Sequence, residues 1–505
     1  MPEQDSEIPR KLVKPDPWDA LLDAHRRFIT NLECAQEMFE LVSPILTLED
    51  EKRQKRIDAI AQEIERDGKT TIEIKSIDDA KGYISHSSRL KTADRMFRQN
   101  MIVSIVSRFD EFVMVLLRRC FELNHSWLKN PEKSVTYVQL LELDSIESFV
   151  DDLILKEVDQ LMRGSHHAQI EILDSKLKLG IEQHFKKWTS FLEITERRNL
   201  FVHSAGIVNS IYVANAEKYG YTVPTQEVLT ADDKYVSETI DVFLELSVRL
   251  VQSVVRRLYP KCFIEADWNL NNLGVSLLKQ SRWDLSLRIF DFALGIPDKL
   301  KSKDEVSYYN IINVCIALKF SGKPFAKKLQ SVNWKPLHPK YMFAIAILED
   351  RFDEAAKLMK SDAVRAQIDE RSLINWPLLR DFRSTDQFQS AFEEMFGRKF
   401  EAGLLEKTKE EIKTERQEYE PELSDAQLKL EYPFDYNSLT TEMAKRYTDF
   451  KANQLYHAIR KPLCLDSKYV IRRFLDPGNP RSQTKDYYSH HVFDVFDSHY
   501  TKSGE

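Results

Sequence analysis

The segment 196–206 reads Glu-Arg-Arg-Asn-Leu-Phe-Val-His-Ser-Ala-Gly and contains the residue types in this chain that best suit phosphate chemistry. Arg198 is followed by Asn199, and His203 stands five positions after Arg198. A guanidinium offers planar donors to phosphate oxygens at any physiological pH. An imidazole takes up and releases a proton near neutrality. Together these groups predict phosphate chemistry that needs no metal ion.

The helix that carries this segment limits what the two side chains can do. The spacing of apolar residues predicts a helix from about 170 to 203, with Ser-Ala-Gly at 204–206 as its end. Five residues rotate an ideal helix by about 500°, which leaves Arg198 and His203 roughly 140° apart. A single regular helix therefore cannot aim both side chains at one phosphate. Either the helix ends inside the motif, or a partner chain supplies the complementary group.

The run from Arg198 to His203, with Asn199 after the arginine, resembles the Arg-x4-6-His motif of HEPN domains. The wider run through Asn209 is similar to HEPN proteins of prokaryotic conflict and abortive-infection systems. The resemblance covers about residues 90–260. It implies an up-and-down helical bundle that pairs with a second copy, so that the motifs of both copies share one cleft. It also implies a metal-independent endoribonuclease acting on single-stranded or transfer RNA.

The resemblance implies a role for each polar residue of the motif. The ribose 2′-hydroxyl would attack the adjacent phosphate and leave a 2′,3′-cyclic phosphate and a 5′-hydroxyl. His203 is expected to be the general base or acid, and Arg198 to stabilise charge on the phosphorane oxygens. Asn199 would orient the arginine or contact the phosphate. Arg197 would add a non-specific phosphate contact, with Glu196 as a supporting residue.

Other residues of the chain allow two readings. Asp110 and Glu111, in a predicted helix from about 93 to 123, either face the cleft and hold the Arg or His, or lie on a solvated helix face. Alternatively, His203 is a histidine favoured by the dipole at a helix C-terminus, and Arg198 pairs with Glu193 or Glu196 on its own helix. The Ser-His-His tripeptides at 165–167 and 489–491 are expected in surface loops, and no metal site is expected.

Composition predicts an all-α protein, and no cofactor is expected because the sequence contains no Walker loop or dinucleotide-binding fingerprint. Apolar residues make up 42% of the 505 residues, charged residues reach 30%, and glycines number only 13, which favours helices. The net charge of −7 means that any RNA contact must come from a local basic patch. Five scattered cysteines form no Cys-x-x-Cys pair and are expected to be reduced. No signal peptide or apolar run of about 20 residues is present, so we expect a cytoplasmic protein without membrane contact.

The second half of the chain resembles tetratricopeptide repeats. Gly274, Ser286 and Pro297 follow the repeat pattern, and Trp283 and Phe352 stand 69 positions apart, about two periods of 34. Such helix pairs predict a surface for a protein partner or regulator. The expected domains are an N-terminal helical segment (1–88), a HEPN-like helical bundle (89–262), tetratricopeptide-like repeats (263–400), and a charged linker with a C-terminal region of unknown role (401–505).

Smaller elements are also expected. A charged helix is predicted from about 51 to 66, and residues 70–74 form either a short strand or an extended connector. An apolar face at helical spacing, from Met96 to Leu117, is expected to be buried. A strongly amphipathic helix is expected over 237–258.

These observations predict a regulated endoribonuclease of defence or growth arrest. The alternatives are a non-catalytic scaffold, in which both helical modules serve binding, and an RNA-binding module that has lost cleavage. Variants of Arg198 and His203 distinguish the three.

Overall fold

The computed structural model describes most of the chain as helix. The described residues are 10–12, 17–66, 69–74, 77–128, 145–259, 262–302, 305–400, 433–448, 470–474, 484–489, 493 and 500–502. They divide into two units, residues 17–388 and residues 1–16 with 389–505. The predicted all-α fold is confirmed. Within these ranges, no helix is both long and apolar enough to cross a membrane.

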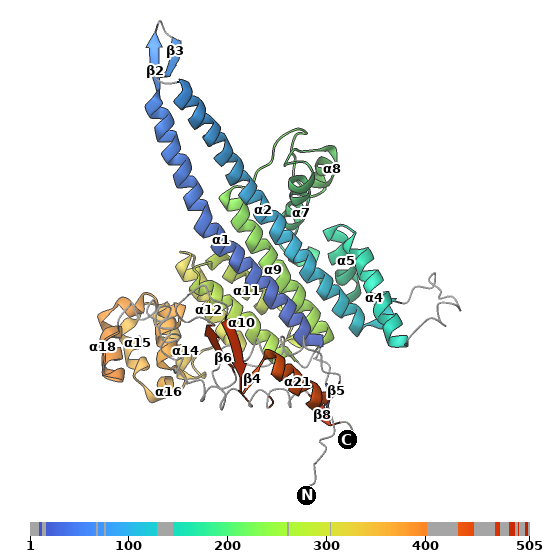
Figure 1. The fold of residues 1–505 in the computed structure, drawn as a ribbon. Coiled ribbons are helices and arrows are strands. Elements are labelled where there is room, and N and C mark those ends of the chain that lie inside the picture. The colour runs from blue at the N-terminus through green and yellow to red at the C-terminus, as the bar shows by residue number, and fades with distance from the viewer. Residues whose placement is uncertain are drawn as a thin grey trace. The chain divides into compact units, whose positions relative to one another are not determined.

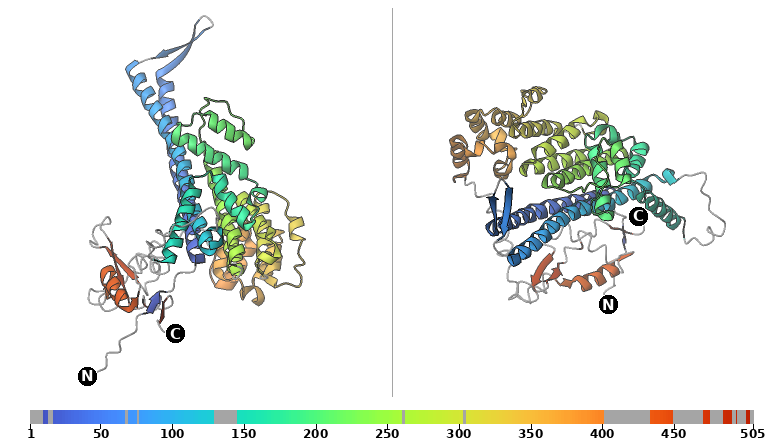
Figure 2. Two further views of the ribbon diagram at one scale, coloured as in Figure 1. Left: turned by 90° about the vertical axis from the view of Figure 1, so that its right-hand side faces the viewer. Right: turned by 90° about the horizontal axis from the view of Figure 1, so that it is seen from above.

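Three long helices form the centre of the unit 17–388. α1 (Pro17–Ile60), α2 (Ile77–Leu123) and α9 (Asp233–Leu258) lie side by side (Figures 1 and 2). The apolar positions of α2 recur every three or four residues, and most of the predicted face is buried. Phe109 on this face packs edge-on against Phe191 and Phe243, with ring centroids 5.5 and 4.9 Å away. These rings join α2 to α9 and to the helix that carries Arg198.

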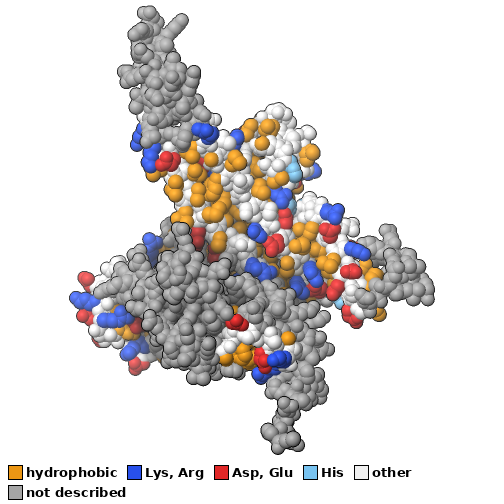
Figure 3. Space-filling model, in the orientation of Figure 1, with side chains coloured by type: hydrophobic (Ala, Val, Ile, Leu, Met, Phe, Trp, Pro, Cys, Tyr) orange, Lys and Arg blue, Asp and Glu red, His pale blue; other side chains and the backbone are white. Residues whose placement is uncertain are grey.

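One apolar surface of the long helices stays exposed. Met96 was expected on the buried face of α2, but its side chain is half exposed. On α1, apolar side chains at helical spacing are also exposed: Met38, Leu41, Ile45 and Leu48. Figure 3 shows hydrophobic side chains gathered over this part of the molecule. Apolar residues at helical spacing therefore identify one face of a helix here, but that face is not buried.

The predicted charged helix over 51–66 is wrong in its second half. α1 ends at Ile60, and β2 (Ala61–Arg66) pairs antiparallel with β3 (Lys69–Ile74). In the sequence, Asp67 and Gly68 stand between the two strands. These two residues lie outside the described ones. The alternating stretch at 70–74 is a strand and not an extended connector, which confirms one of the two alternatives predicted for it.

The predicted helix over 170–203 is several helices. The segment contains α5 (His166–Leu177), the short α6 (Ile181–His184) and α7 (Trp188–His203), and it follows α4 (Ile146–Met162). Lys178 and Gly180 adopt left-handed backbone conformations, with φ of 52° and 68°. The Asp174 carboxylate accepts hydrogen bonds from the backbone N–H of Gly180 and Ile181 and holds this turn. The left-handed residues end α5 and allow α7 a new direction.

Helix pairs follow α9. The helices are α10 (Phe263–Lys279), α11 (Trp283–Gly295), α12 (Val306–Phe320), α13 (Ala326–Leu329), α14 (Pro339–Leu348), α15 (Phe352–Met359), α16 (Asp362–Arg365) and α17 (Glu370–Asn375). Trp283 and Phe352 each begin the second helix of a pair, as their spacing suggested. The expected division at 262/263 falls between α9 and α10, whereas that at 88/89 falls inside α2. The tetratricopeptide resemblance stays a prediction.

Gly274 gives a test of the first helix pair. A Cβ at Gly274 would overlap the ring of Phe290 on α11, and the Gly274 carbonyl accepts a hydrogen bond from Ser286 Oγ at 2.9 Å. We expect Gly274→Ala to lower the free energy of unfolding by about 1–3 kcal/mol, because an overpacked ring must move. Gly295→Ala is the control, since nothing lies within 4 Å of its Cβ position. Equal effects of the two changes in urea unfolding would contradict this packing.

His25 makes stability depend on pH. Its ring lies in the core near Phe112, and its Nε2 is 3.2 Å from Ser247 Oγ. Burial lowers the pKa of His25 from 6.5 to about 3. Because the unfolded chain binds this proton and the folded chain does not, stability is complete above pH 6.5 and falls as the pH drops toward 3. The expected loss is about 1.4 kcal/mol per pH unit.

The measurement for His25 is unfolding of the parent and of His25→Gln between pH 6.5 and about 5, above most carboxyl pKa values. The parent should lose stability as the pH falls, and the variant should lose less. Parallel curves would show that His25 carries no such linkage.

In its described residues, the second unit combines short strands with one helix and most of another. β1 (Arg10–Leu12) lies between β5 (Tyr447–Thr448) and β8 (Tyr500–Lys502) in one sheet. A second sheet has the order β4-β7-β6: Phe434–Asp435, Thr484–Tyr488 and Val470–Phe474. The helices are α21 (Tyr436–Arg446) and the end of α18 (Asp386–Phe396). Most of the predicted charged linker lies outside the described residues.

Candidate active site

Arg198 on α7 reaches across to Asp110 on α2. The Arg198 Nη2 donates a hydrogen bond to Asp110 Oδ2 at 3.0 Å, over 88 positions of sequence. The packing of Phe109 against Phe191 sets the distance between the two helices. The structure therefore places Asp110 beside Arg198, as one interpretation of the sequence expected. The helix α2 is continuous at Asp110.

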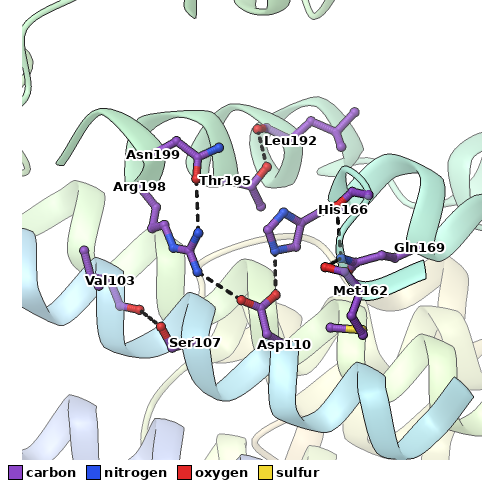
Figure 4. A network of polar contacts seen from close by, with 11 residues as sticks. Val103, Ser107, Asp110, Met162, His166, Gln169, Leu192, Thr195, Arg198 and Asn199 are labelled. Carbon is purple, nitrogen blue, oxygen red and sulfur yellow. Dashed lines mark hydrogen bonds and ion pairs between the residues drawn. The ribbon is translucent and has the colours of Figure 1, made fainter. Parts of the chain in front are cut away.

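Asp110 holds a second group, which the sequence did not indicate. His166 is the first residue of α5, and its Nε2 lies 2.7 Å from Asp110 Oδ1. Ser165 caps this helix by accepting a hydrogen bond from the N–H of Ala168 at 3.2 Å. The surface loop expected at 165–167 is therefore wrong. Figure 4 shows Asp110 between Arg198 and His166.

The three side chains form a partly open site. Their side chains are 21% (Arg198), 27% (Asp110) and 11% (His166) exposed, so solvent reaches the cluster. Asn199 Oδ1 accepts a hydrogen bond from Arg198 Nη1 at 3.1 Å, which is the orienting role expected for it. A guanidinium has five N–H donors in a rigid fork. Two of them bind Asp110 and Asn199, and the fork is fixed in direction by these contacts.

His203 lies apart from this cluster. It is the last residue of α7, and its side chain is exposed. α7 runs without a break from Arg198 to His203, so the helix does not end inside the motif. The rotation angle allowed two arrangements: a helix that ends inside the motif, or a partner chain that supplies the complementary group. The continuous α7 excludes the first. Arg198 points toward α2, whereas His203 faces solvent.

Arg197 and Glu193 form a separate buried network. The Glu193 carboxylate accepts hydrogen bonds from Arg197 Nε, Tyr212 Oη and Tyr235 Oη at 2.7, 2.7 and 2.8 Å. Arg197 also lies 4.2 Å from the centre of the Tyr235 ring and donates to the carbonyl of Thr230. Burial and the nearby Glu193 raise the pKa of Tyr212 and of Tyr235. Arg197 therefore takes part in packing α7, and the phosphate contact expected of it stays a prediction.

This network predicts a large stability effect. Glu193→Gln leaves the Arg197 charge without a carboxylate in the protein interior, because the Glu193 side chain is only 3% exposed. We expect the free energy of unfolding to fall by about 3 kcal/mol. Glu196→Gln, one turn further along α7 and half-buried, should change it by less than about 0.5 kcal/mol. Chemical denaturation of both variants measures the difference, and similar small effects would contradict the network.

The remaining predicted residues lie elsewhere. Glu111 is exposed and pairs with Arg108 on its own helix at 3.2 Å, so the solvated face is the correct reading for it. The pairing of Arg198 with Glu193 or Glu196 is wrong, because its ion pair is with Asp110. His490 and His491 lie outside the described residues.

No family model, curated protein or solved structure matches the chain. Its function must therefore be inferred from the contacts and the exposure of the side chains around Arg198.

Proposed function

We propose that this protein is a metal-independent endoribonuclease whose site includes Arg198, Asn199 and His203. The observation that supports it best is the fixed guanidinium of Arg198. A carboxylate on α2 and an amide on α7 both orient it, while its side chain stays partly exposed. A guanidinium held in one direction before substrate arrives stabilises developing phosphorane charge without reorganising.

The reaction is an internal transfer within RNA. An imidazole takes the proton of the ribose 2′-hydroxyl, and O2′ forms a bond to the adjacent phosphorus. The bond from phosphorus to O5′ breaks, and O5′ receives a proton from an imidazolium. Products are a 2′,3′-cyclic phosphate and a 5′-hydroxyl, so no electron acceptor or water is consumed. His203, exposed at the end of α7, supplies the imidazole.

A second copy of the chain would complete the site. Because α7 is continuous, Arg198 and His203 of one chain are directed roughly 140° apart. Exposed apolar side chains follow His203: Ile207 and Val228, paired across a short bridge, and Ile211 at the start of α8 (Ser210–Lys218). Such a surface suits a contact between two copies. In the proposed dimer, the His203 of one copy meets the Arg198 of the other.

Regulation belongs to the same proposal. A continuously active ribonuclease in the cytoplasm would harm its own cell, so a partner bound to the helix pairs after α9 would restrain it. The protein would then act as a toxin or an antiviral effector when the restraint is released.

A non-catalytic scaffold is the second candidate. The ion pair between Arg198 and Asp110 favours it, because a paired arginine that is only 21% exposed also serves to hold α7 on α2. In that case both helical modules bind partners, and His203 is a solvent-exposed residue without a chemical role.

The experiment is incubation of the full-length protein with single-stranded RNA and with transfer RNA in excess EDTA, followed by mapping of the product ends. Cleavage with 2′,3′-cyclic phosphate ends is expected. Intact RNA, together with absence of toxicity when the protein is expressed, would favour the scaffold.

A further inference from the structure

A cavity of about 520 Å³ lies in the unit 17–388, away from the candidate active site. Its walls are α9, the connection between α5 and α7, and the end of α11 with the turn after it. None of the residues of the Arg198 cluster lines it. Its volume falls in the range of small-molecule pockets, about 300–1,000 Å³.

Cationic side chains dominate the lining. They are Lys178, Lys186, Arg249, Arg256, Arg257 and Arg288, against the carboxylates of Glu245 and Asp291. The whole chain has a net charge of −7, so the cavity is opposite in sign to the protein around it. A concave surface of one sign concentrates ligands of the other.

Carboxylates neutralise only part of this charge, and Asp267, which is outside the lining, pairs with the buried Arg256 at 2.7 Å. The buried Glu245 accepts hydrogen bonds from Arg249 Nε at 2.9 Å and from Arg288 Nε at 2.7 Å, so two guanidiniums share it. Arg288 has a further, longer contact with Asp241 at 3.6 Å. Asp291 lies 3.8 Å from a lysine outside the cavity, Lys328.

Three cations of the lining have no carboxylate partner among the described residues. Arg257 donates to the carbonyl oxygen of Lys178 at 3.0 Å, and the side chains of Lys178, Lys186 and Arg257 are all exposed. These groups can approach an anion without first breaking an ion pair. Guanidiniums and ammoniums in this arrangement are the usual ligands of phosphate.

An aromatic wall lies beside these cations. The guanidinium carbon of Arg249 is 4.7 Å from the ring centre of Phe292 and 5.7 Å from that of Phe185. A guanidinium over a ring forms a flat surface on which another planar group can stack.

We propose that this cavity binds a phosphorylated small molecule of nucleotide size. Its phosphates would contact Arg257 and Lys186, and its ring would lie against Phe292 and Arg249. A small molecule fits better than an RNA strand because the donors surround one hollow and do not follow a groove. The inference goes beyond the proposed ribonuclease activity and does not depend on it.

The test is titration calorimetry of the full-length protein with ATP, and separately with pyrophosphate and with adenosine. ATP should bind with one site per chain and adenosine far more weakly. Arg257→Glu and Lys186→Glu should each weaken ATP binding about tenfold or more. Each change replaces a cation that contacts phosphate by a carboxylate that repels it. Lys218→Glu, which makes the same charge change on α8 outside the cavity, should leave binding unchanged.

Thermal unfolding of each variant shows whether its fold is kept. The proposal is overturned if neither ATP nor pyrophosphate binds, or if both cavity variants bind ATP as the parent does. It is also overturned if the cavity variants weaken binding of a single-stranded RNA while ATP does not bind, since the cavity would then belong to an RNA surface.

Discussion

His203→Ala is expected to abolish RNA cleavage, lowering the rate by about 10²–10⁴-fold, the usual contribution of a general acid or base. The fold should remain, because the side chain is exposed at the last position of α7 and no described residue bonds to it. The loss of a favourable helix-dipole contact costs at most about 1 kcal/mol. The measurement is the cleavage rate in EDTA beside the unfolding temperature.

His167→Ala is the matched control for this change. His167 is 40% exposed and lies on α5, where it packs edge-on against the Trp188 ring at a centroid distance of 5.8 Å and lies 3.8 Å from Glu182. The substitution removes one exposed imidazole and none of the side chains that contact Arg198 or Asp110. Equal cleavage rates for His203→Ala and the parent would show that His203 has no chemical role and would contradict its place in the proposed site.

Asp110→Asn is expected to lower cleavage about 10²-fold, with little change in the binding of RNA. The amide keeps the shape of the side chain but loses the charge that holds Arg198 Nη2 at 3.0 Å and His166 Nε2 at 2.7 Å. A guanidinium displaced by about 1 Å from the phosphorane oxygens loses rate on this scale. Single-turnover rates and RNA affinity, measured separately, distinguish the two effects.

Glu111→Gln provides the control for Asp110→Asn. It removes the adjacent carboxylate on the same helix, and its partner Arg108 is as exposed as Glu111 itself. Surface ion pairs of this kind contribute about 0–1 kcal/mol. A structural role for Asp110 alone would instead appear as lower stability with an unchanged rate, which would count against the assignment.

The helices themselves follow from the sequence. The face of α2 from Met101 to Leu117 repeats at three and four residues and is buried, since burying such a face is what stabilises a long helix. Met96 follows the same period yet is exposed. Periodicity identifies a face, whereas burial depends on whether another element lies against it.

The candidate site was only partly predictable. Arg198 and Asn199 are neighbours in a recognisable motif. Asp110 and His166 join them through contacts that span 88 and 56 positions of the chain, by a pairing of helices that the apolar pattern does not specify. Ser165 before an apolar run was a usable signal, because a serine N-cap begins a helix and excludes a loop.

The break between α5 and α7 also escaped prediction. Apolar residues continue through 178–187 at nearly helical spacing, and only Gly180 suggests a stop. Lys178 takes a left-handed conformation that its residue type does not favour, and the Asp174 carboxylate holds the turn after it.

The most direct test of the shared ribonuclease site mixes two inactive variants, Arg198→Ala and His203→Ala, and measures RNA cleavage in EDTA. If each site combines the Arg198 of one copy with the His203 of the other, heterodimers contain one intact site. An equal mixture should then recover roughly a quarter of the parent rate, while each variant alone stays inactive. An active parent whose variants give no recovery after exchange of subunits would contradict the shared site. A parent that leaves RNA intact would contradict the ribonuclease itself.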